Sequence, residues 1–335
     1  MKKVAVIGAG LQAHRRLQPI LDDKEYAVPL IVDLYEERAQ MLAKSCDAAV
    51  SSNWRDAVND PGIDAILLLT YPDSHAKIAI AAMKKGKDVL CEKPLARTET
   101  EAKKMIKVAH ETKRILKCGF NHRHHPAVVE MHKLFESGLI GKAVFGRGRY
   151  GIAGRSGVEK EWRSNPKIVS GGQLMEQGIH LVDLYRWFLG DMTKATGMVA
   201  TNYWPMQPLE DNAFAVMQNK DGVMVSIHSS LTQWINLFEF ELYGEKGSLV
   251  FQNLGASYGT EKLIISEHDP NKPFSYKTIE YRGGDSSWKN EWLEFTKAVT
   301  TRKEPLGNGE DGYRAIQIVN AVYKASKTGR TIDLT

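Results

Sequence analysis

Residues 171–190 carry acidic and basic side chains at spacings that allow proton transfer. Glu176, His180 and Asp183 lie at positions i, i+4 and i+7, so they share one face if residues 174–189 form a helix. Histidine titrates near neutral pH, and a carboxylate one turn away stabilises its charged form. The spacing therefore predicts His180 as a general base with Glu176 beside it. The alternative is that these residues form the solvated face of an amphipathic helix.

A second candidate for chemistry is the sequence Glu92-Lys93-Pro94, which directly follows the apolar residues 89–91. Residues 89–91 are predicted to form a short parallel strand. Loops at the carboxyl ends of such strands face the ligand in open α/β sheets. Lys93 is therefore predicted to be an active-site residue, and Glu92 and Lys93 are both expected at the cofactor.

The elements that must position these side chains begin with a nucleotide-binding fingerprint. The apolar residues 4–7 precede Gly8-x-Gly10-x-x-Ala13, and Asp33 closes the next apolar run about 20 residues further on. Gly8 permits a sharp turn, Gly10 leaves room for a pyrophosphate, and Ala13 lets the helix pack close to the strand. Asp33 would accept hydrogen bonds from ribose hydroxyls and repel a 2'-phosphate, which favours NAD over NADP. The alternative is a glycine turn in a sheet that binds no nucleotide.

Further cofactor contacts are expected at the start of two helices. Leu11 and Gln12 open the helix after the glycine turn, where unpaired N–H groups bind phosphate. Thr70, Pro72 and His75 follow the apolar strand 63–70, and so lie at a carboxyl end that faces the ligand. The alternative is that Asp73 or Ser74 only caps a helix and that His75 is a surface residue.

Length and composition limit the class of protein. A chain of 335 residues is long enough for two domains. Its net charge of +5, with no block of basic residues, does not indicate a nucleic-acid partner. No stretch approaches the roughly 18 apolar residues of a membrane span. The three cysteines, Cys46, Cys91 and Cys118, are few and odd in number, which favours reduced thiols in the cytosol.

The pattern of elements changes near residue 120. Strands and helices alternate up to that point, which predicts a doubly wound parallel α/β domain that binds NAD over residues 1–120. In residues 238–242, apolar and acidic side chains alternate, which is typical of an antiparallel strand with one buried face. Residues 121–335 are therefore predicted to form an α+β domain with a large, mainly antiparallel sheet. Its outer face would meet solvent or a second subunit, and helices over residues 288–300 and 312–326 would close the chain.

The chain resembles the Gfo/Idh/MocA oxidoreductases, the group of glucose-fructose oxidoreductase and inositol dehydrogenase. The resemblance covers nearly the whole chain. It rests on residues 8–13, Cys91-Glu92-Lys93-Pro94-Leu95-Ala96, Asn121-x-Arg123-x-x-Pro126, residues 171–183 and residues 311–334. It implies NAD(P)-dependent chemistry on sugars, polyols or nucleotide-linked sugars, in a homodimer or homotetramer built through the C-terminal sheet.

The resemblance also implies roles for single residues. Lys93 matches the active-site lysine of the family and His180 its catalytic histidine, whereas Glu176 stands where many members have Asp. Asn121 and Arg123 belong to a shared motif and are expected near the substrate.

The segments 159–163 and 231–236 look like substrate-lining segments of the family. Trp162 and Trp234 could stack on a sugar ring, and Arg163 could hold a carboxylate or phosphate. Both tryptophans could equally be core residues. The histidines at 122, 124 and 125 lack the partners of a metal site, so no metal is expected.

The sequence therefore predicts a cytoplasmic NAD-dependent dehydrogenase or reductase acting on CH–OH groups of a sugar-type substrate. His180 would take the hydroxyl proton, and Lys93 would donate to the same oxygen. Two alternatives remain open. One is a glycosidase or epimerase of the same fold that uses NAD transiently, and the other is a non-catalytic NAD-sensing regulator.

Overall fold

The structure, a computed structural model, describes residues 1–334, and these form two compact units. The first unit comprises residues 1–121 and 288–314, and the second comprises residues 122–287 and 315–334. The sequence predicts residues 288–314 as part of the C-terminal domain, whereas by their contacts they group with residues 1–121. The physical reason is that Trp292, Phe295 and Val299 share a hydrophobic core with Val6 and Leu17.

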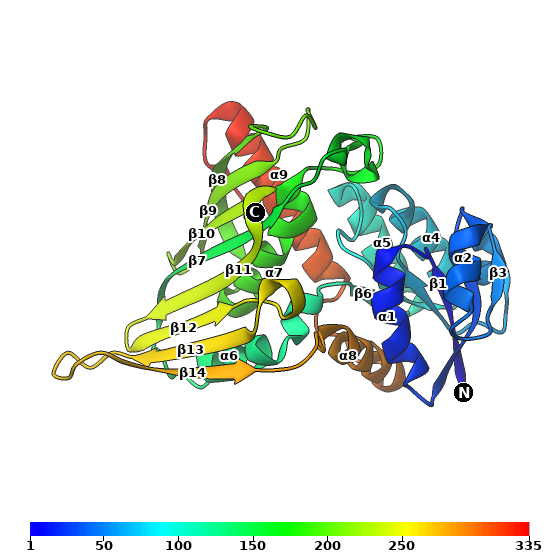
Figure 1. The fold of residues 1–335 in the computed structure, drawn as a ribbon, viewed down its shortest axis with the longest axis horizontal. Helices are drawn as coiled ribbons and strands as arrows, with labels where there is room; N and C mark the ends of the chain where they lie inside the picture. Colours follow the sequence, from blue (N-terminus) through cyan, green and yellow to red (C-terminus); the bar gives the residue numbers. More distant parts are fainter. Residues whose placement is uncertain (335) are drawn as a thin grey trace. The chain divides into compact units, whose positions relative to one another are not determined.

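The first unit is built on a six-stranded parallel sheet with strand order β3-β2-β1-β4-β5-β6 (Figure 1). Its strands are β1 Lys2–Ile7, β2 Tyr26–Val32, β3 Ala49–Ser51, β4 Ala65–Leu68, β5 Asp88–Cys91 and β6 Leu116–Cys118. Its helices are α1 Leu11–Leu21, α2 Glu36–Ala43, α3 Trp54–Asn59, α4 Pro72–Lys84, α5 Glu99–Thr112 and α8 Ser287–Thr301. The direction of winding reverses between β1 and β4, and ligands of open α/β sheets bind beyond the strand ends at such a switch point. The predicted doubly wound fold is confirmed.

The second unit is built on a nine-stranded sheet with order β14-β13-β12-β11-β7-β10-β9-β8-β15. All neighbouring strands are antiparallel except β7 and β10. The strands are β7 Ala143–Ala153, β8 Met192–Ala200, β9 Asn212–Asn219, β10 Met224–Ser230, β11 Thr232–Gly244, β12 Gly247–Gln252, β13 Glu261–Glu267, β14 Ser275–Tyr281 and β15 Ile332–Asp333. The predicted large antiparallel sheet is thus confirmed.

Helices of the second unit cover one face of this sheet (Figure 1). They are α6 Pro126–Glu136, α7 Ile179–Leu189 and the latter part of α9 Gly309–Thr328, and a π-helical turn, Leu174–Gly178, leads into α7. Helix α7 packs closely on β7 at Gly146. A Cβ at this position would lie 2.6 Å from the Tyr185 ring, so the close approach requires glycine. A short 3-10 turn, η1 Asn121–His124, precedes α6.

The strand β11 shows why the alternating pattern predicts a sheet with two different faces. Phe238, Phe240 and Leu242 are fully buried on the helix-covered side. Glu239 and Glu241 point to the outer face, but they too are largely buried, because arginines of β7 pair with them. Among residues 1–334, no helix is long and apolar enough to cross a membrane.

Candidate active site

The glycine turn between β1 and α1 has the geometry that a dinucleotide phosphate needs. Gly8 has φ +103°, and a Cβ there would lie 2.7 Å from the carbonyl group of Leu69, so only glycine fits. A Cβ on Gly10, the N-cap of α1, would meet nothing within 4 Å, and no side chain caps the helix. Leu11 is largely exposed, and Gln12 Oε1 is buried without a hydrogen-bond partner in the described residues. Open space beside uncapped N–H groups fits a bound pyrophosphate.

Asp33, directly after β2, is held against this turn. Its Oδ2 accepts a hydrogen bond from the Ala9 N–H at 2.7 Å, and its Oδ1 accepts one from the Tyr35 N–H at 2.9 Å. The fold thus brings the acid of the fingerprint to the glycine turn, although 24 positions separate Ala9 from Asp33 in the chain. This arrangement fits the NAD site that the sequence predicts.

His75 is buried rather than exposed, so the alternative of a surface residue is wrong. Its Nε2 lies 2.9 Å from the carbonyl oxygen of Thr70, and its Nδ1 lies 3.0 Å from that of Pro94. Burial lowers the pKa of His75 despite these two contacts. No side-chain cap is made at the start of α4, where Pro72 occupies the first turn. His75 therefore ties the loops after β4 and β5 together.

Glu92 and Lys93 lie where β5 ends, as expected. The Glu92 carboxylate turns toward Arg16 of α1, whose Nε is 2.6 Å from Oε1, and its Oε2 accepts a hydrogen bond from the Lys93 N–H at 3.0 Å. The Lys93 side chain is partly buried. A direct cofactor contact of Glu92 stays a prediction.

In the second unit, the helix that carries His180 is anchored at its start by a buried carboxylate. Glu210 accepts hydrogen bonds from the N–H groups of Gly172 and Leu174, both at 2.9 Å, and from the Tyr323 hydroxyl at 2.8 Å. Burial raises the pKa of Glu210 despite these donors. A Cβ on Gly172 would lie 2.1 Å from the Glu210 carbonyl oxygen, so the glycines before this helix do serve a close approach.

His180 itself is 4% exposed and packs among aromatic rings. Its ring stacks on that of His122, with centroids 3.8 Å apart and planes 19° apart. His125, from the same histidine cluster, has its Nδ1 2.9 Å from a carboxylate oxygen of Glu261. No group of three or more metal-binding side chains occurs in residues 1–334, and His122 contributes to the surroundings of His180 instead.

The two acids that share the helix with His180 each pair with an arginine. Glu176 Oε1 accepts a hydrogen bond from Arg163 Nε at 2.9 Å. Asp183 accepts two from the Arg123 fork, at 2.8 and 2.6 Å, and this pair is buried. The predicted helix over residues 174–189 is present, with a π-helical first part, but the solvated-face alternative is wrong for Asp183.

The remaining substrate candidates lie in different surroundings. Trp162 packs against a small apolar cluster and lies under the Arg163 guanidinium, 4.2 Å from its ring centre. Trp234 is 57% exposed, with its ring 4.9 Å from that of Tyr203, so it is not a core residue. Asn121 is buried in η1. Contacts of these residues and of Arg123 with a substrate stay predictions.

A buried charge cluster around Arg16 was missed by reasoning from the sequence. Arg16 lies on the face of α1 that also carries Ala13, Leu17 and Ile20, all of which are buried. A single charged residue on an apolar helix face is a signal that could have found it, because such a charge is buried only when paired.

Two family models match the chain. Residues 2–120 match an oxidoreductase family described by its NAD-binding Rossmann fold, and residues 128–250 match the Gfo/Idh/MocA C-terminal domain. Levoglucosan dehydrogenase of Pseudarthrobacter phenanthrenivorans is 28% identical over 85% of this chain and 83% of its own. Inositol 2-dehydrogenase of Salmonella typhimurium is 24% identical over 98% and 95%, respectively.

Solved structures share the fold over the full length. A levoglucosan dehydrogenase in complex with NADH and levoglucosan has a TM-score of 0.91 at 22% identity, and the match covers 100% of this chain and 99% of that chain. A complex with NADH alone has a TM-score of 0.90 at 24% identity, with the same coverage.

Proposed function

Because this chain belongs to the Gfo/Idh/MocA family of NAD-binding oxidoreductases, we propose that it transfers a hydride between NAD and a sugar or polyol carbon. The observation that carries the proposal is the hydrogen bond of Asp33 to the backbone of the glycine turn. It joins the two parts of the dinucleotide fingerprint, which directly follow the neighbouring strands β1 and β2.

The residues that would hold NAD are those of the first unit. The N–H groups at the start of α1 bind the pyrophosphate, and Asp33 accepts hydrogen bonds from the ribose hydroxyls. Bound NAD supplies the redox chemistry by accepting or donating a hydride at its nicotinamide ring. The protein's own residues supply placement and move the proton.

His180 and Lys93 are the proposed acid–base residues. In the oxidative direction, His180 accepts the proton of the substrate hydroxyl, and Lys93 donates a hydrogen bond to the same oxygen. The buried pair of Arg123 and Asp183 and the anchor at Glu210 support this role, because they fix the helix that carries His180.

A sugar or polyol is the proposed substrate class. Named relatives act on levoglucosan, inositol and 1,5-anhydro-D-fructose. In this chain, Trp162 with Arg163 and the exposed Trp234 offer the aromatic faces and charge that a sugar would contact.

A substrate panel tests the proposed function. The protein with NAD is offered levoglucosan, myo-inositol and simple sugars, and NADH formation is followed. With NADH, it is offered 1,5-anhydro-D-fructose. We expect turnover with at least one sugar or polyol. A protein that neither gains thermal stability with NAD nor turns over any of these compounds would contradict the proposal.

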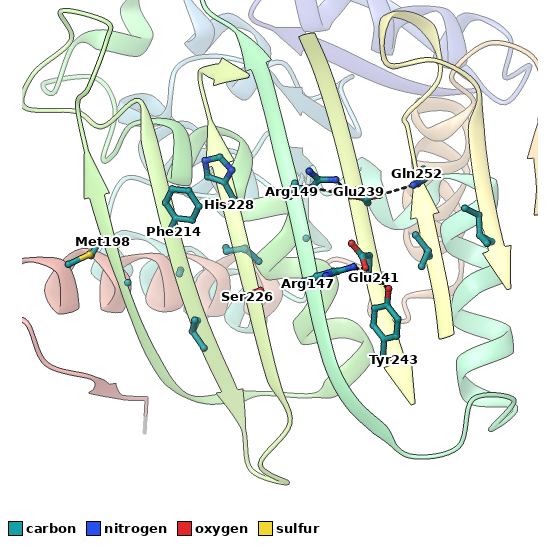
Figure 2. A pocket seen from close by; sticks show the side chains of 17 residues that line it. Arg147, Arg149, Met198, Phe214, Ser226, His228, Glu239, Glu241, Tyr243 and Gln252 are labelled. Carbon is teal, nitrogen blue, oxygen red and sulfur yellow. Dashed lines mark hydrogen bonds and ion pairs between the residues drawn. The ribbon is translucent and has the colours of Figure 1, made fainter. Parts of the chain in front are cut away.

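A second copy of the chain is the proposed partner of the outer face of the nine-stranded sheet. Figure 2 shows this face as an open hollow lined by side chains of neighbouring strands. Met198 and Phe214 are 77% and 59% exposed there. Arg147 pairs with Glu241, and Arg149 pairs with Glu239. The exposed apolar residues of this face support a homodimer or a homotetramer, because a two-fold axis can pair the same patch of two copies.

A cytosolic location is also proposed. No disulfide joins Cys46, Cys91 or Cys118 within residues 1–334, and Cys91 and Cys118 are buried, which suits a reducing compartment.

A further inference from the structure

A cluster of four buried charges includes Glu92, the residue directly before Lys93. Arg16 of α1 has its Nε and Nη2 both 2.6 Å from Glu92 Oε1, and its Nη1 pairs with Glu291 of α8. Lys117 of β6 has its Nζ 3.9 Å from the other oxygen of Glu291. The side chains of Arg16, Lys117 and Glu291 are at most 3% exposed. Two positive and two negative charges balance inside the first unit.

Stability alone gives little reason for such a cluster. Removing charges from water costs several kcal/mol per ion, and apolar residues of similar volume often stabilise a core as well or better. Burial opposes the charge of Arg16, but Glu291 and Glu92 outweigh it and raise the pKa of the guanidinium. For Glu291, burial outweighs Arg16 and Lys117 and raises the carboxyl pKa. The contacts of the cluster with neighbouring loops give it a second possible role.

The charge cluster contacts the start of the loop that carries Lys93. The Glu92 carboxylate accepts from Arg16 on one oxygen and from the Lys93 N–H on the other, at 3.0 Å. On the far side of Lys93, the Pro94 carbonyl oxygen lies 3.0 Å from His75 Nδ1. The backbone of Lys93 is thus fixed from both sides.

The Arg16 guanidinium has close neighbours on two further sides. The Trp288 ring lies over its guanidinium at 4.6 Å, which adds a cation–π contact. On another side, a Cβ on Gly119 would lie 2.8 Å from Arg16 Nη2 and 3.1 Å from Glu92 Cα. A side chain at position 119 would therefore crowd the contact between Arg16 and Glu92.

We propose that Arg16 and Glu291 are positioning residues that set the place of Lys93. The inference rests on the role of Lys93 proposed above. Arg16 belongs to α1, whose first turn would bind the cofactor phosphate. The cluster therefore joins the cofactor-binding helix to the loop that carries the hydrogen-bond donor.

The test is a double-mutant cycle. The first variant, Glu291→Gln, removes the negative charge but keeps the shape of the side chain. The second variant combines Arg16→Met with Glu291→Met, so that both charges of one ion pair are removed, which limits the loss of stability. Each is made with Lys93 present and with Lys93→Ala. We expect kcat to fall by about 10- to 10²-fold when Lys93 is present, because small misplacements of a reacting group have effects of this size. With Lys93→Ala, the same changes should cause no further loss.

A matched control is Arg302→Met, which breaks the ion pair of Arg302 with Asp88 at the opposite end of β5. It should lower the melting temperature without lowering kcat. Equal losses of kcat in both Lys93 backgrounds, or no loss in either, would overturn the inference.

A crystal structure of the Arg16→Met, Glu291→Met variant separates this inference from the proposed function. We expect the Lys93 backbone to move relative to β5. An unmoved loop would overturn the positioning role whatever the turnover. Normal turnover of Lys93→Ala alone would instead contradict the proposed function.

Discussion

At the scale of single residues, Asp33 and His180 each have an observed structural contact and a proposed chemical role. Asp33 accepts a hydrogen bond from the Ala9 N–H, and we propose that its charge also repels a 2'-phosphate. The ring of His180 stacks on the ring of His122, and we propose that His180 is the general base. Substitutions can separate the structural contact of each residue from its proposed chemical role.

Asp33→Asn removes the charge of Asp33 but keeps an oxygen that can accept from Ala9. We expect the preference for NAD(H) over NADP(H) to shrink, because the repulsion of the 2'-phosphate is lost. Calorimetric titration of both cofactors measures the change, and Asp33→Ser, which also weakens the hold on the turn, serves as the comparison. Equal affinity of the unaltered protein for both cofactors would show that Asp33 does not select NAD.

His180→Ala and Lys93→Ala separate catalysis from binding. Loss of a general base is typically worth about 10²- to 10⁴-fold in rate, and loss of one charge-stabilising donor about 10²- to 10³-fold. We expect kcat and kcat/KM to fall together by these amounts, with NAD affinity changed only a few-fold. His110→Ala, on the exposed face of α5, is the control and should turn over normally. Near-normal turnover of His180→Ala would assign this histidine a structural role.

The sequence predicted which residues share the helix of His180 but not their partners. The i, i+4, i+7 spacing is local and follows from the period of a helix. Arg123 is 60 positions from Asp183 in the chain, so their ion pair depends on tertiary packing, which the spacing does not encode. The position of His75, between carbonyl groups of two different loops, was beyond local patterns for the same reason.

At the scale of elements, the positions of strands were easier to predict than the domain against which each helix packs. The alternation in β11 and the apolar runs of β1 and β4 each reflect one local environment. Helix α8 follows the second sheet in the chain, yet it packs into the core of the first unit. Its apolar stripe predicts that it is buried, but not against which sheet.

The loops after β4 and β5 should loosen in acid because His75 joins them. Burial lowers the pKa of His75, so the unfolded chain binds its proton first as the pH falls. The contribution of His75 to stability should therefore be lost as the pH falls below about 6.5, the ordinary value of histidine. In the unaltered protein, the free energy of unfolding should decrease as the pH falls. In His75→Gln this decrease should be smaller, by up to about 1.4 kcal/mol per pH unit.

Urea unfolding between neutral pH and about pH 5 measures this slope. His110→Gln, an exposed histidine in the same unit, is the control and should keep the parent's slope. An unchanged slope for His75→Gln would mean that His75 takes up its proton equally in the folded and unfolded chain.

At the scale of the whole molecule, the outer face of the nine-stranded sheet is what a second copy would cover. Phe214→Glu places a charge among the exposed apolar residues of that face (Figure 2). We expect light scattering to give a multiple of 37.5 kDa for the unaltered protein and a smaller species for the variant, because a buried unpaired charge opposes association. Met41→Glu, an exposed methionine on α2, is the control. A single 37.5 kDa species for the unaltered protein at micromolar concentration would rule out this interface.

Hydride transfer between a sugar carbon and NAD is the central claim, and isotope transfer tests it most directly. The protein is incubated with NAD and carbon-deuterated levoglucosan, myo-inositol and simple sugars, and the reduced cofactor is examined by mass spectrometry. The account predicts that deuterium from one substrate carbon appears in NADH, and that His180→Ala binds NAD but transfers deuterium about 10²- to 10⁴-fold more slowly. NAD binding without deuterium transfer from any of these compounds, or transfer at the same rate in His180→Ala, would contradict it.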